Sequence, residues 1–179
     1  MDVERILQTV EPLLPQFRKN RLFVTSRPGV EDPLHDGSGW LPDGVTEADF
    51  TVLNAPFRDT AIEELLQSIP YKLGRVRLMI LPPKTCYSFH FDTTTRLHYA
   101  ITTNPDCYLV ERQQEQAKLF HVPADGWVYR MDTRLVHNAM NCSNEPRLHL
   151  VAANLEEEGP PGAKPTDLAS HPIPELDKT

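Results

Sequence analysis

Short apolar segments separated by polar turns are the main pattern of the chain from residue 75 onward. The segments are rich in Val, Ile, Leu, Tyr and Phe. Between them lie groups of Pro, Gly, Asn, Asp and Ser, which are typical of turns and loops. Several short strands at this regular spacing predict a sandwich or barrel of β-sheets. The predicted strands span residues 75–81, 86–92, 97–103, 107–111, 117–122, 127–131 and 147–153.

Two helices are predicted near the N-terminus, before these strands begin. Residues 1–20 carry apolar side chains at helical spacing, and two prolines divide this segment into shorter pieces. The second helix covers residues 60–68, where Thr60 and Glu63 form a capping-box pattern. We therefore expect a mainly β fold, a double-sheet jelly roll of the cupin type, with the N-terminal helices packed on one sheet.

Two segments fall outside these predicted elements. Residues 27–47 hold Pro, Gly and Asp around Trp40, and this segment is interpreted either as a long surface loop or as a lid beside the functional site. Residues 156–179 hold five prolines and few apolar residues, which predicts a disordered tail or a strap on the surface. We expect one domain over residues 1–155, made of a helical part over about 1–70 and a jelly-roll core over about 75–155.

Composition and charge limit the classes of function. The 179 residues are 40% hydrophobic and 24% charged, as in a soluble globular domain. The net charge is -7 without a dense run of Lys and Arg, so we expect no nucleic-acid partner. We find no secretory signal and no apolar stretch near the ~20 residues that cross a bilayer. Three cysteines without C-x-x-C spacing indicate reduced thiols, and we expect a cytoplasmic protein that does not bind membranes.

Two histidines and a carboxylate form a candidate metal site. His90 and Asp92 are two residues apart within a predicted strand, so their side chains project to the same side. A sheet fold can bring His137 from a distant strand to complete a triangular set of ligands. Nitrogen and oxygen donors of this kind suit non-haem Fe(II) and leave positions open for oxygen and substrate. Taken singly, neither the H-x-D pair nor His137 indicates a metal, because an isolated H-x-D is common and a histidine that begins a strand is more often hydrogen-bonded in the core or on the surface.

Several arginines are candidates for binding a carboxylate. Arg147 follows His137 by ten residues, where its fork-shaped cation can hold a carboxylate beside the metal. The alternatives for Arg147 are a surface charge or an ion pair with Glu145. A substrate carboxylate has further candidate partners, each of which is otherwise a solvated charge on a strand or loop. These candidates are Arg77, Arg130 and Arg134.

The order and spacing of these residues resemble the aspartyl/asparaginyl β-hydroxylase family over roughly residues 50–155. The segments that carry the resemblance are 75–83, 87–92, 96–104 and 126–151, which include Tyr-Ser-Phe-His-Phe-Asp and Arg-Leu-His-Leu-Val. The resemblance implies a double-stranded β-helix and a dioxygenase that uses Fe(II), 2-oxoglutarate and molecular oxygen. Such an enzyme would hydroxylate an unactivated C–H bond of a small-molecule amino acid, or of an amino-acid side chain in a peptide or protein.

The resemblance also implies a role for each matching residue. Arg147 is implied to pair with the distal carboxylate of 2-oxoglutarate. Arg96 and His98 match the R-x-H motif of the family, which lies against the cosubstrate, and Tyr87 lies within reach of it. The alternatives are a loop charge for Arg96, a core position for His98 and aromatic packing for Tyr87. The implied iron ligands, and hence catalytic residues, are His90, Asp92 and His137.

Asp92 indicates which branch of the family the chain is most similar to. The vertebrate members that hydroxylate Asp and Asn in folded domains lack the carboxylate ligand, whereas bacterial members, including hydroxylases of free proline, have it. The carboxylate also argues against a halogenase, in which that position must be free for halide. The bacterial enzymes carry a helical region after the barrel, and this chain has a Pro-rich segment there, which argues against free proline as substrate.

Two other classes of function compete with the oxygenase. One is a cupin metalloenzyme, an isomerase or hydrolase, that uses another divalent metal without 2-oxoglutarate. The other is a non-catalytic jelly-roll module that binds a sugar or peptide. The combination of His90, Asp92 and His137 separates them, because a binding module does not need all three.

Overall fold

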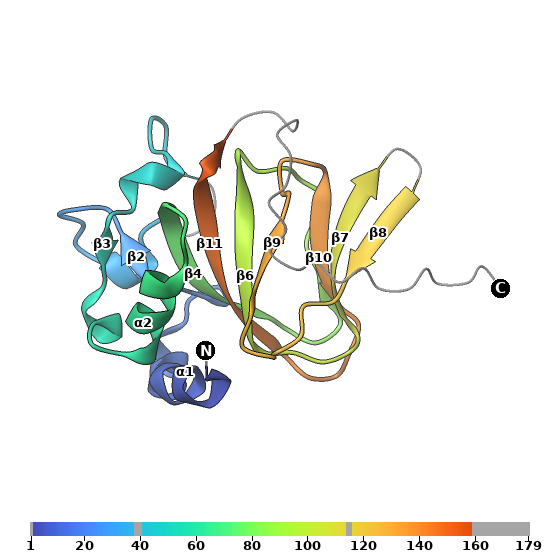
Figure 1. Ribbon diagram of the computed structural model, residues 1–179, viewed down its shortest axis with the longest axis horizontal. Helices are drawn as coiled ribbons and strands as arrows, with labels where there is room; N and C mark the ends of the chain where they lie inside the picture. The colour runs from blue at the N-terminus through green and yellow to red at the C-terminus, as the bar shows by residue number, and fades with distance from the viewer. Residues whose placement is uncertain (1, 38–40, 114–115, 159–179) are drawn as a thin grey trace.

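The computed structural model describes residues 2–37, 41–113 and 116–158. Within these residues, two antiparallel sheets face each other across a core (Figure 1). One sheet has the strand order β1-β4-β11-β6-β9 and the other has the order β5-β10-β7-β8. From β4 onward the chain passes back and forth between the sheets, so the predicted mainly β jelly roll is confirmed. The bounds are β1 Arg21–Phe23, β4 Leu73–Leu81, β5 Thr85–Cys86, β6 Thr94–Thr102, β7 Cys107–Gln113, β8 Gln116–Phe120, β9 Val128–Met131, β10 His137–Asn141 and β11 Arg147–Glu158.

Two α-helices, α1 (Val3–Val10) and α2 (Ala61–Ser68), lie together on one side of the five-stranded sheet (Figure 1). Their apolar residues share one hydrophobic core with alternate residues of β4, β6 and β11. The expected packing of N-terminal helices on one sheet is therefore confirmed. This core includes Ile6, Val10, Ile62 and Leu65 from the helices and Val76, Leu78, Leu97, Tyr99, Leu148 and Leu150 from the strands.

The strands of the five-stranded sheet present two very different faces. Leu78, Leu97 and Leu150 point toward the helices. Their neighbours in sequence, among them Arg77 and His98, point between the two sheets because side chains alternate along a strand. Buried basic and imidazole groups therefore occupy much of the space between the sheets, and the apolar cluster that remains there is small.

Shorter elements connect the helices and strands. The 3-10 helix η1 (Glu11–Gln16) contains the two prolines of the first helical segment, so α1 ends where the prolines predict. The remaining short elements are the 3-10 helices η2 Pro33–His35, η3 Glu47–Asp49 and η4 Ala55–Phe57, and the strands β2 Thr25–Ser26 and β3 Val52–Leu53, which pair with each other.

Three expectations about local structure are wrong. The segment 86–92 is not one strand, because β5 ends at Cys86 and His90 forms only an isolated bridge with His137. Three residues lie between Cys86 and His90, whereas two lie between their partners Met140 and His137, so the chain bulges out of the ladder. The N-terminal part is not wholly helical, because it contributes β1 to the main sheet. The third is an omission: β10 is not among the predicted strand ranges, although His137 was expected to lie on a strand.

The capping box expected at α2 is also wrong. Thr60 does cap the helix, since its side-chain oxygen accepts from the Ile62 amide at 3.3 Å. Glu63, however, accepts a hydrogen bond from the Asp59 amide at 2.6 Å instead of from Thr60. Asp59 has a φ of 58°, and this left-handed conformation directs its N–H toward the helix.

Parts of two expected segments lie outside the described residues. Residues 38–40, which include Trp40, belong to this group, as do 159–179 of the predicted tail. Residues 156–158, which the sequence pattern assigns to that tail, extend β11. No helix in the described ranges is long and apolar enough to cross a membrane.

Gly74 on β4 packs directly beneath the backbone of η3. A Cβ placed at this residue would lie 2.5 Å from the carbonyl oxygen of Glu47 and 2.9 Å from a methyl carbon of Leu155. Gly74→Ala is therefore expected to lower the free energy of unfolding by about 2 kcal/mol or more, because backbone must move. Denaturant unfolding measures this loss, and an unchanged midpoint would contradict the close packing. Gly29→Ala is a comparison variant, since its Cβ meets no atom within 4 Å. Its only expected loss is about 1 kcal/mol, which comes from the positive φ of 74°.

Candidate metal centre

His90, Asp92 and His137 come together at one end of the space between the sheets. One ligand atom from each residue lies within 4.8 Å of the others. The imidazole rings of the two histidines have centroids 4.4 Å apart, and His137 Nε2 lies 3.9 Å from Asp92 Oδ2. His137 is buried, and the other two residues are half-buried. The group is therefore open on one side and closed on the other.

Individual backbone hydrogen bonds, and not a regular strand ladder, position His90 and Asp92. His90 and His137 exchange backbone hydrogen bonds of 3.0 and 2.8 Å across their isolated bridge. Asp92 lies beyond the bridge, and its amide donates to the Thr133 carbonyl at 2.7 Å. The hydroxyl of Thr133 in turn donates to the Thr94 carbonyl at 2.6 Å. Each candidate ligand is thus held by hydrogen bonds that its own backbone forms.

Both histidines present the same ring nitrogen to the centre. His90 Nδ1 lies 2.8 Å from the Ser88 carbonyl oxygen, and His137 Nδ1 lies 2.9 Å from the Leu135 carbonyl oxygen. A carbonyl oxygen only accepts, so each Nδ1 carries the hydrogen and each Nε2 of the neutral ring has a free lone pair. Burial lowers the pKa of His137, which favours this neutral form. Hydrogen bonding of the non-ligating nitrogen is a usual feature of metal-binding histidines.

A buried chain of charges holds Asp92 in place. Arg96 Nε donates to Asp92 Oδ2 at 3.0 Å, and its Nη2 donates to Glu47 Oε1 at 2.6 Å. Glu47 also accepts two hydrogen bonds from Arg75, at 2.8 and 2.7 Å. Burial alone raises the pKa of Asp92, but Arg96 and His137 outweigh it, so the net pKa is lowered. The carboxylate is therefore ionised and oriented before any ligand binds.

Arg147 opens β11 and points between the sheets. It is 3% exposed, and its Nε has no hydrogen-bond partner within the described part of the chain. Burial lowers its pKa, an effect partly offset by Tyr87 and Cys107 nearby, and a guanidinium remains a cation even so. The alternative that Arg147 is a surface charge is therefore wrong. Arg147 is a buried cation with donor capacity left over.

Two further histidines are buried between the sheets. His98 on β6 and His149 on β11 are in edge-to-face contact, with ring centroids 5.9 Å apart. Burial, together with the positive charge of Arg147, holds the pKa of each well below its usual range. Among the described residues, His98 Nδ1 and both ring nitrogens of His149 lack a hydrogen-bond partner. The interior therefore contains neutral imidazoles with unused donors and acceptors.

The three other candidate arginines have different surroundings. Arg134 is held by two hydrogen bonds of 2.7 Å to Asp132, and Arg130 sits opposite Leu97 and so faces the helix side of its sheet. Arg77 is buried on the inner face of β4, and its Nε has no partner in the described ranges. Arg77 alone of the three combines an interior position with a free buried donor.

Three residues of the interior were not foreseen from the sequence. They are Glu47, Arg75 and His149. Glu47 comes from the segment 27–47 and reaches the interior only through the path of the chain, so no local signal marks it. Arg75 and His149 lie at inward positions of otherwise apolar strands, and polar residues at such positions are a usable signal.

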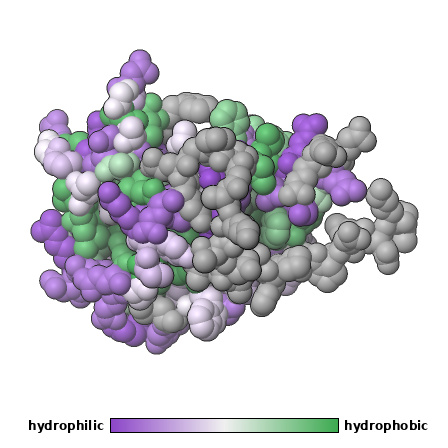
Figure 2. All heavy atoms as spheres, turned by 45° about the horizontal axis from the view of Figure 1, so that its top comes forward, coloured by the Kyte–Doolittle hydropathy of each residue, from purple (hydrophilic) through white to green (hydrophobic). Residues whose placement is uncertain are grey.

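Exposed apolar residues flank the candidate metal ligands in the sequence. Phe89, Phe91 and Val136 each adjoin a ligand in sequence, and Phe91 is 70% exposed. Figure 2 shows that hydrophobic residues reach the surface in separate patches among hydrophilic ones.

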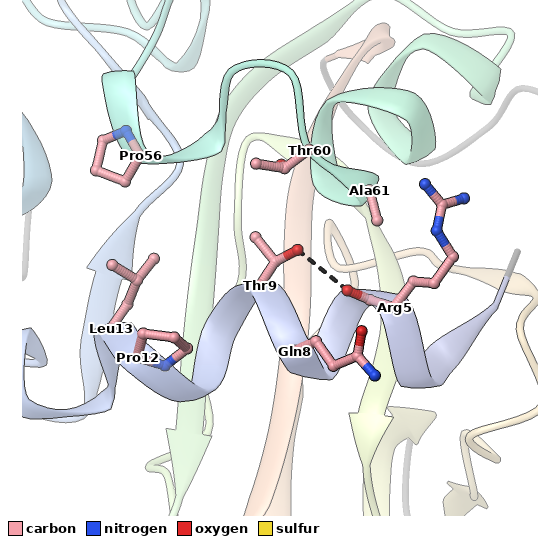
Figure 3. Close-up of a pocket in the computed structure, with 8 residues that line it drawn as sticks. All are labelled: Arg5, Gln8, Thr9, Pro12, Leu13, Pro56, Thr60 and Ala61. Atoms are coloured by element: carbon pink, nitrogen blue, oxygen red, sulfur yellow. Dashed lines mark hydrogen bonds between the residues drawn. The ribbon is translucent and has the colours of Figure 1, made fainter.

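A shallow hollow on the helical side lies between α1 and the start of α2 (Figure 3). It is lined by Arg5, Thr9 and six other residues, none of which is a candidate site residue.

The geometry can be compared with known proteins. The sequence model of the family "Aspartyl/Asparaginyl beta-hydroxylase" matches residues 54–155, which is more than half of the chain. The chain belongs to this family. The match includes every candidate ligand and cosubstrate residue named above, and it places the protein among hydroxylases at the level of the family. A search of curated proteins found no match.

Comparison with solved structures gives only distant likenesses. A 2OG-Fe(II) oxygenase family oxidoreductase from Burkholderia pseudomallei is 13% identical, with a TM-score of 0.43, over 60% of this chain and 54% of that one. A cupin domain from Bordetella pertussis Tohama I is 17% identical, with a TM-score of 0.39, over 49% of this chain and 86% of that one. At these scores neither structure adds to what the sheets and the family already establish.

Glu47 is expected to stabilise the fold in a pH-dependent manner. Burial raises its pKa, but Arg96 and Arg75 outweigh this and lower it overall. A depressed pKa means stabilisation that is present above the unfolded value of about 4.3 and is lost as the pH falls through the folded value. Glu47→Gln should therefore lower the free energy of unfolding by about 3 kcal/mol at pH 7, because two buried guanidiniums lose their carboxylate.

Denaturant unfolding from pH 7 downward tests this expectation. The difference between the two proteins should shrink once the pH falls below about 4. Glu31→Gln, at an exposed carboxylate, should have little effect throughout. A loss that stays equal at every pH would show that glutamine disturbs packing, and not charge pairing.

Proposed function

We propose that this protein is an Fe(II)- and 2-oxoglutarate-dependent dioxygenase that hydroxylates an unactivated C–H bond of an amino acid, either free or within a peptide or protein. The observation that carries the proposal is the set His90, Asp92 and His137, whose ligand atoms converge within 4.8 Å beside the buried cation of Arg147. Membership of the aspartyl/asparaginyl β-hydroxylase family supports the same class of reaction.

The donor set fits Fe(II). Two imidazole nitrogens and one carboxylate leave the remaining positions of an octahedral ion open for a chelating cosubstrate and oxygen. The fixed Nδ1 hydrogen bonds of His90 and His137 make Nε2 the ligand atom of each. Arg96 keeps the carboxylate of Asp92 ionised and correctly turned. The protein therefore contributes a preorganised set of ligands, and little rearrangement is needed on binding.

The interior also fits 2-oxoglutarate. Arg147 would hold its distal carboxylate, since its Nε is buried without another partner in the described chain. Arg96 and His98 would lie along the end nearest the metal, and Tyr87 lies close to Arg147. Fe(II) with 2-oxoglutarate and molecular oxygen supplies the oxidising chemistry, and the protein orients the reactants and excludes water.

Arg77 is the proposed partner of a substrate carboxylate. It lies on the same row of the sheet as Val151 and His98, on the face that looks between the sheets. Arg75 and Arg96 beside it are already paired with the carboxylates of Glu47 and Asp92. A buried guanidinium without a carboxylate is unfavourable, so an acidic substrate that enters the interior gains an ion pair.

Anaerobic titration of the apoprotein with Fe(II) and then 2-oxoglutarate tests the proposed function. We expect a weak visible charge-transfer band when 2-oxoglutarate is added. Asp92→Ala should bind the metal much more weakly, because a ligand is lost. Arg147→Ala should retain the metal and require at least tenfold more 2-oxoglutarate, because a buried carboxylate loses its charged partner.

Arg18→Ala is a matched control, since it removes an exposed arginine and should leave the band unchanged. Metal binding without any band in the unaltered protein would favour a cupin metalloenzyme of different chemistry. Absence of metal binding would favour the non-catalytic binding module.

Conversion of 2-oxoglutarate to succinate in the presence of amino acids tests the role of Arg77. We expect some of the twenty free amino acids, their N-acetyl forms or their amides to stimulate turnover. Arg77→Gln should raise the KM for the stimulating compound at least tenfold and leave 2-oxoglutarate binding unchanged. Arg130→Gln, on the other face of its sheet, should affect neither. Equal stimulation in Arg77→Gln would exclude Arg77 as the substrate partner.

A further inference from the structure

His149 is a buried polar residue whose ring packs against His98 but forms no hydrogen bond in the described part of the chain. It is 1% exposed, and neither Nδ1 nor Nε2 finds a hydrogen-bond partner in the described part of the chain. Its neighbours across the sheet are Met79 on β4 and Ala100 on β6. Buried imidazole nitrogens are normally satisfied, and an apolar residue of similar size would suit these neighbours better. Histidine at this position therefore lowers the free energy of unfolding, because its ring nitrogens lose their hydrogen bonds to water and gain none in the folded chain.

The strand places His149 next to Arg147. The two residues are two apart on β11, and their partners on β4 are Leu81 and Met79 in regular register, so both side chains project between the sheets. The pairing of β11 with β6 shifts between Leu148 and His149. Such bulges re-aim side chains and are frequent beside functional sites.

The surroundings of His149 favour an anion. Its strongest electrostatic neighbours are Arg147, His98 and His121. None of these is a carboxylate. The ring is neutral, because burial first and Arg147 second lower its pKa far below the usual range. A neutral imidazole offers one N–H donor and one acceptor. A donor beside a buried guanidinium forms a two-residue site for a carboxylate.

We propose that His149 donates a hydrogen bond to the distal carboxylate of 2-oxoglutarate, beside Arg147. This inference rests on the proposed function and adds a binding residue to it. The distal end is favoured over the metal end because His149 is two residues from Arg147 on β11, whereas His98 is two residues from Arg96, which bonds Asp92. His98 therefore lies nearer the metal, and His149 lies nearer Arg147.

Calorimetric binding of two 2-oxo acids to the Mn(II)-loaded protein tests the proposal. 2-Oxoglutarate has the distal carboxylate, and 2-oxopentanoate has the same chain length without it. His149→Leu is expected to weaken the binding of 2-oxoglutarate about tenfold or more, since a hydrogen bond to a charged group is lost. The binding of 2-oxopentanoate should be unchanged. His149→Asn and His149→Gln place an amide N–H near the positions of Nδ1 and Nε2, and one of them should restore part of the affinity.

The outcomes separate this inference from the proposed function. Unchanged 2-oxoglutarate binding in His149→Leu would overturn the inference alone, and so would an equal loss for both acids. If the unaltered protein binds Mn(II) but neither acid, the proposed function fails as well. A His149→Leu protein that does not fold would indicate a structural role for His149 and would also overturn the inference.

Thermal unfolding of the metal-free protein gives a second measurement. His149→Leu should keep or raise the melting temperature by a few degrees, because two unpaired polar atoms leave the interior. The control is His35→Leu, since both ring nitrogens of His35 are bonded, to Asp32 and to the Gln16 carbonyl. That variant should lower the melting temperature and leave the affinity for both 2-oxo acids unchanged. A clear loss of stability in His149→Leu would indicate a structural role and overturn the inference.

Discussion

The ion pair between Arg96 and Asp92 is the interaction on which the candidate site depends. Asp92 lies outside any strand, in a segment that has left the ladder, so the sheet alone does not orient its carboxylate. Arg96 is on a central strand and bonds Asp92 and Glu47 at once. Because Glu47 enters from η3, the N-terminal part is a component of the site, and not an accessory to the jelly roll. A buried pair of this kind contributes more to geometry than to net stability.

The strands β4, β6 and β11 carry core-forming apolar residues on one face and buried polar residues on the other. Leu78, Leu97 and Leu150 build the large core with the helices, and their sequence neighbours Arg77, His98 and His149 face the second sheet. The apolar cluster between the sheets is consequently small. We infer that the helices α1 and α2 provide the burial that the interior gives up to polar groups, which explains why a jelly roll of this size has helices on its outer face.

Sequence reasoning succeeded where one local pattern decides the structure. The strands near 75–81, 97–103 and 147–153 are rich in apolar and β-branched residues, and all three were found. Strand β10 was missed because His-Asn-Ala-Met-Asn has no β-branched residue, and its pairing is set by β5 and β7. The three candidate ligands were predicted together from their types and order, and the structure brings them together. Glu47 was missed because its contact with Arg96 spans 49 positions, a distance over which no periodicity carries information.

Charge balance in the interior bears on the nature of the substrate. Arg75 and Arg96 are neutralised by Glu47 and Asp92, whereas Arg77 and Arg147 each have a buried Nε without a partner in the described chain. In the proposed function, one carboxylate of 2-oxoglutarate pairs with Arg147 and the other chelates the metal, which leaves Arg77 unpaired. The divalent charge of the metal nearby makes that unpaired guanidinium less favourable still. In this proposal the anion that pairs with Arg77 arrives with the substrate, so the proposed function favours a substrate that carries a carboxylate.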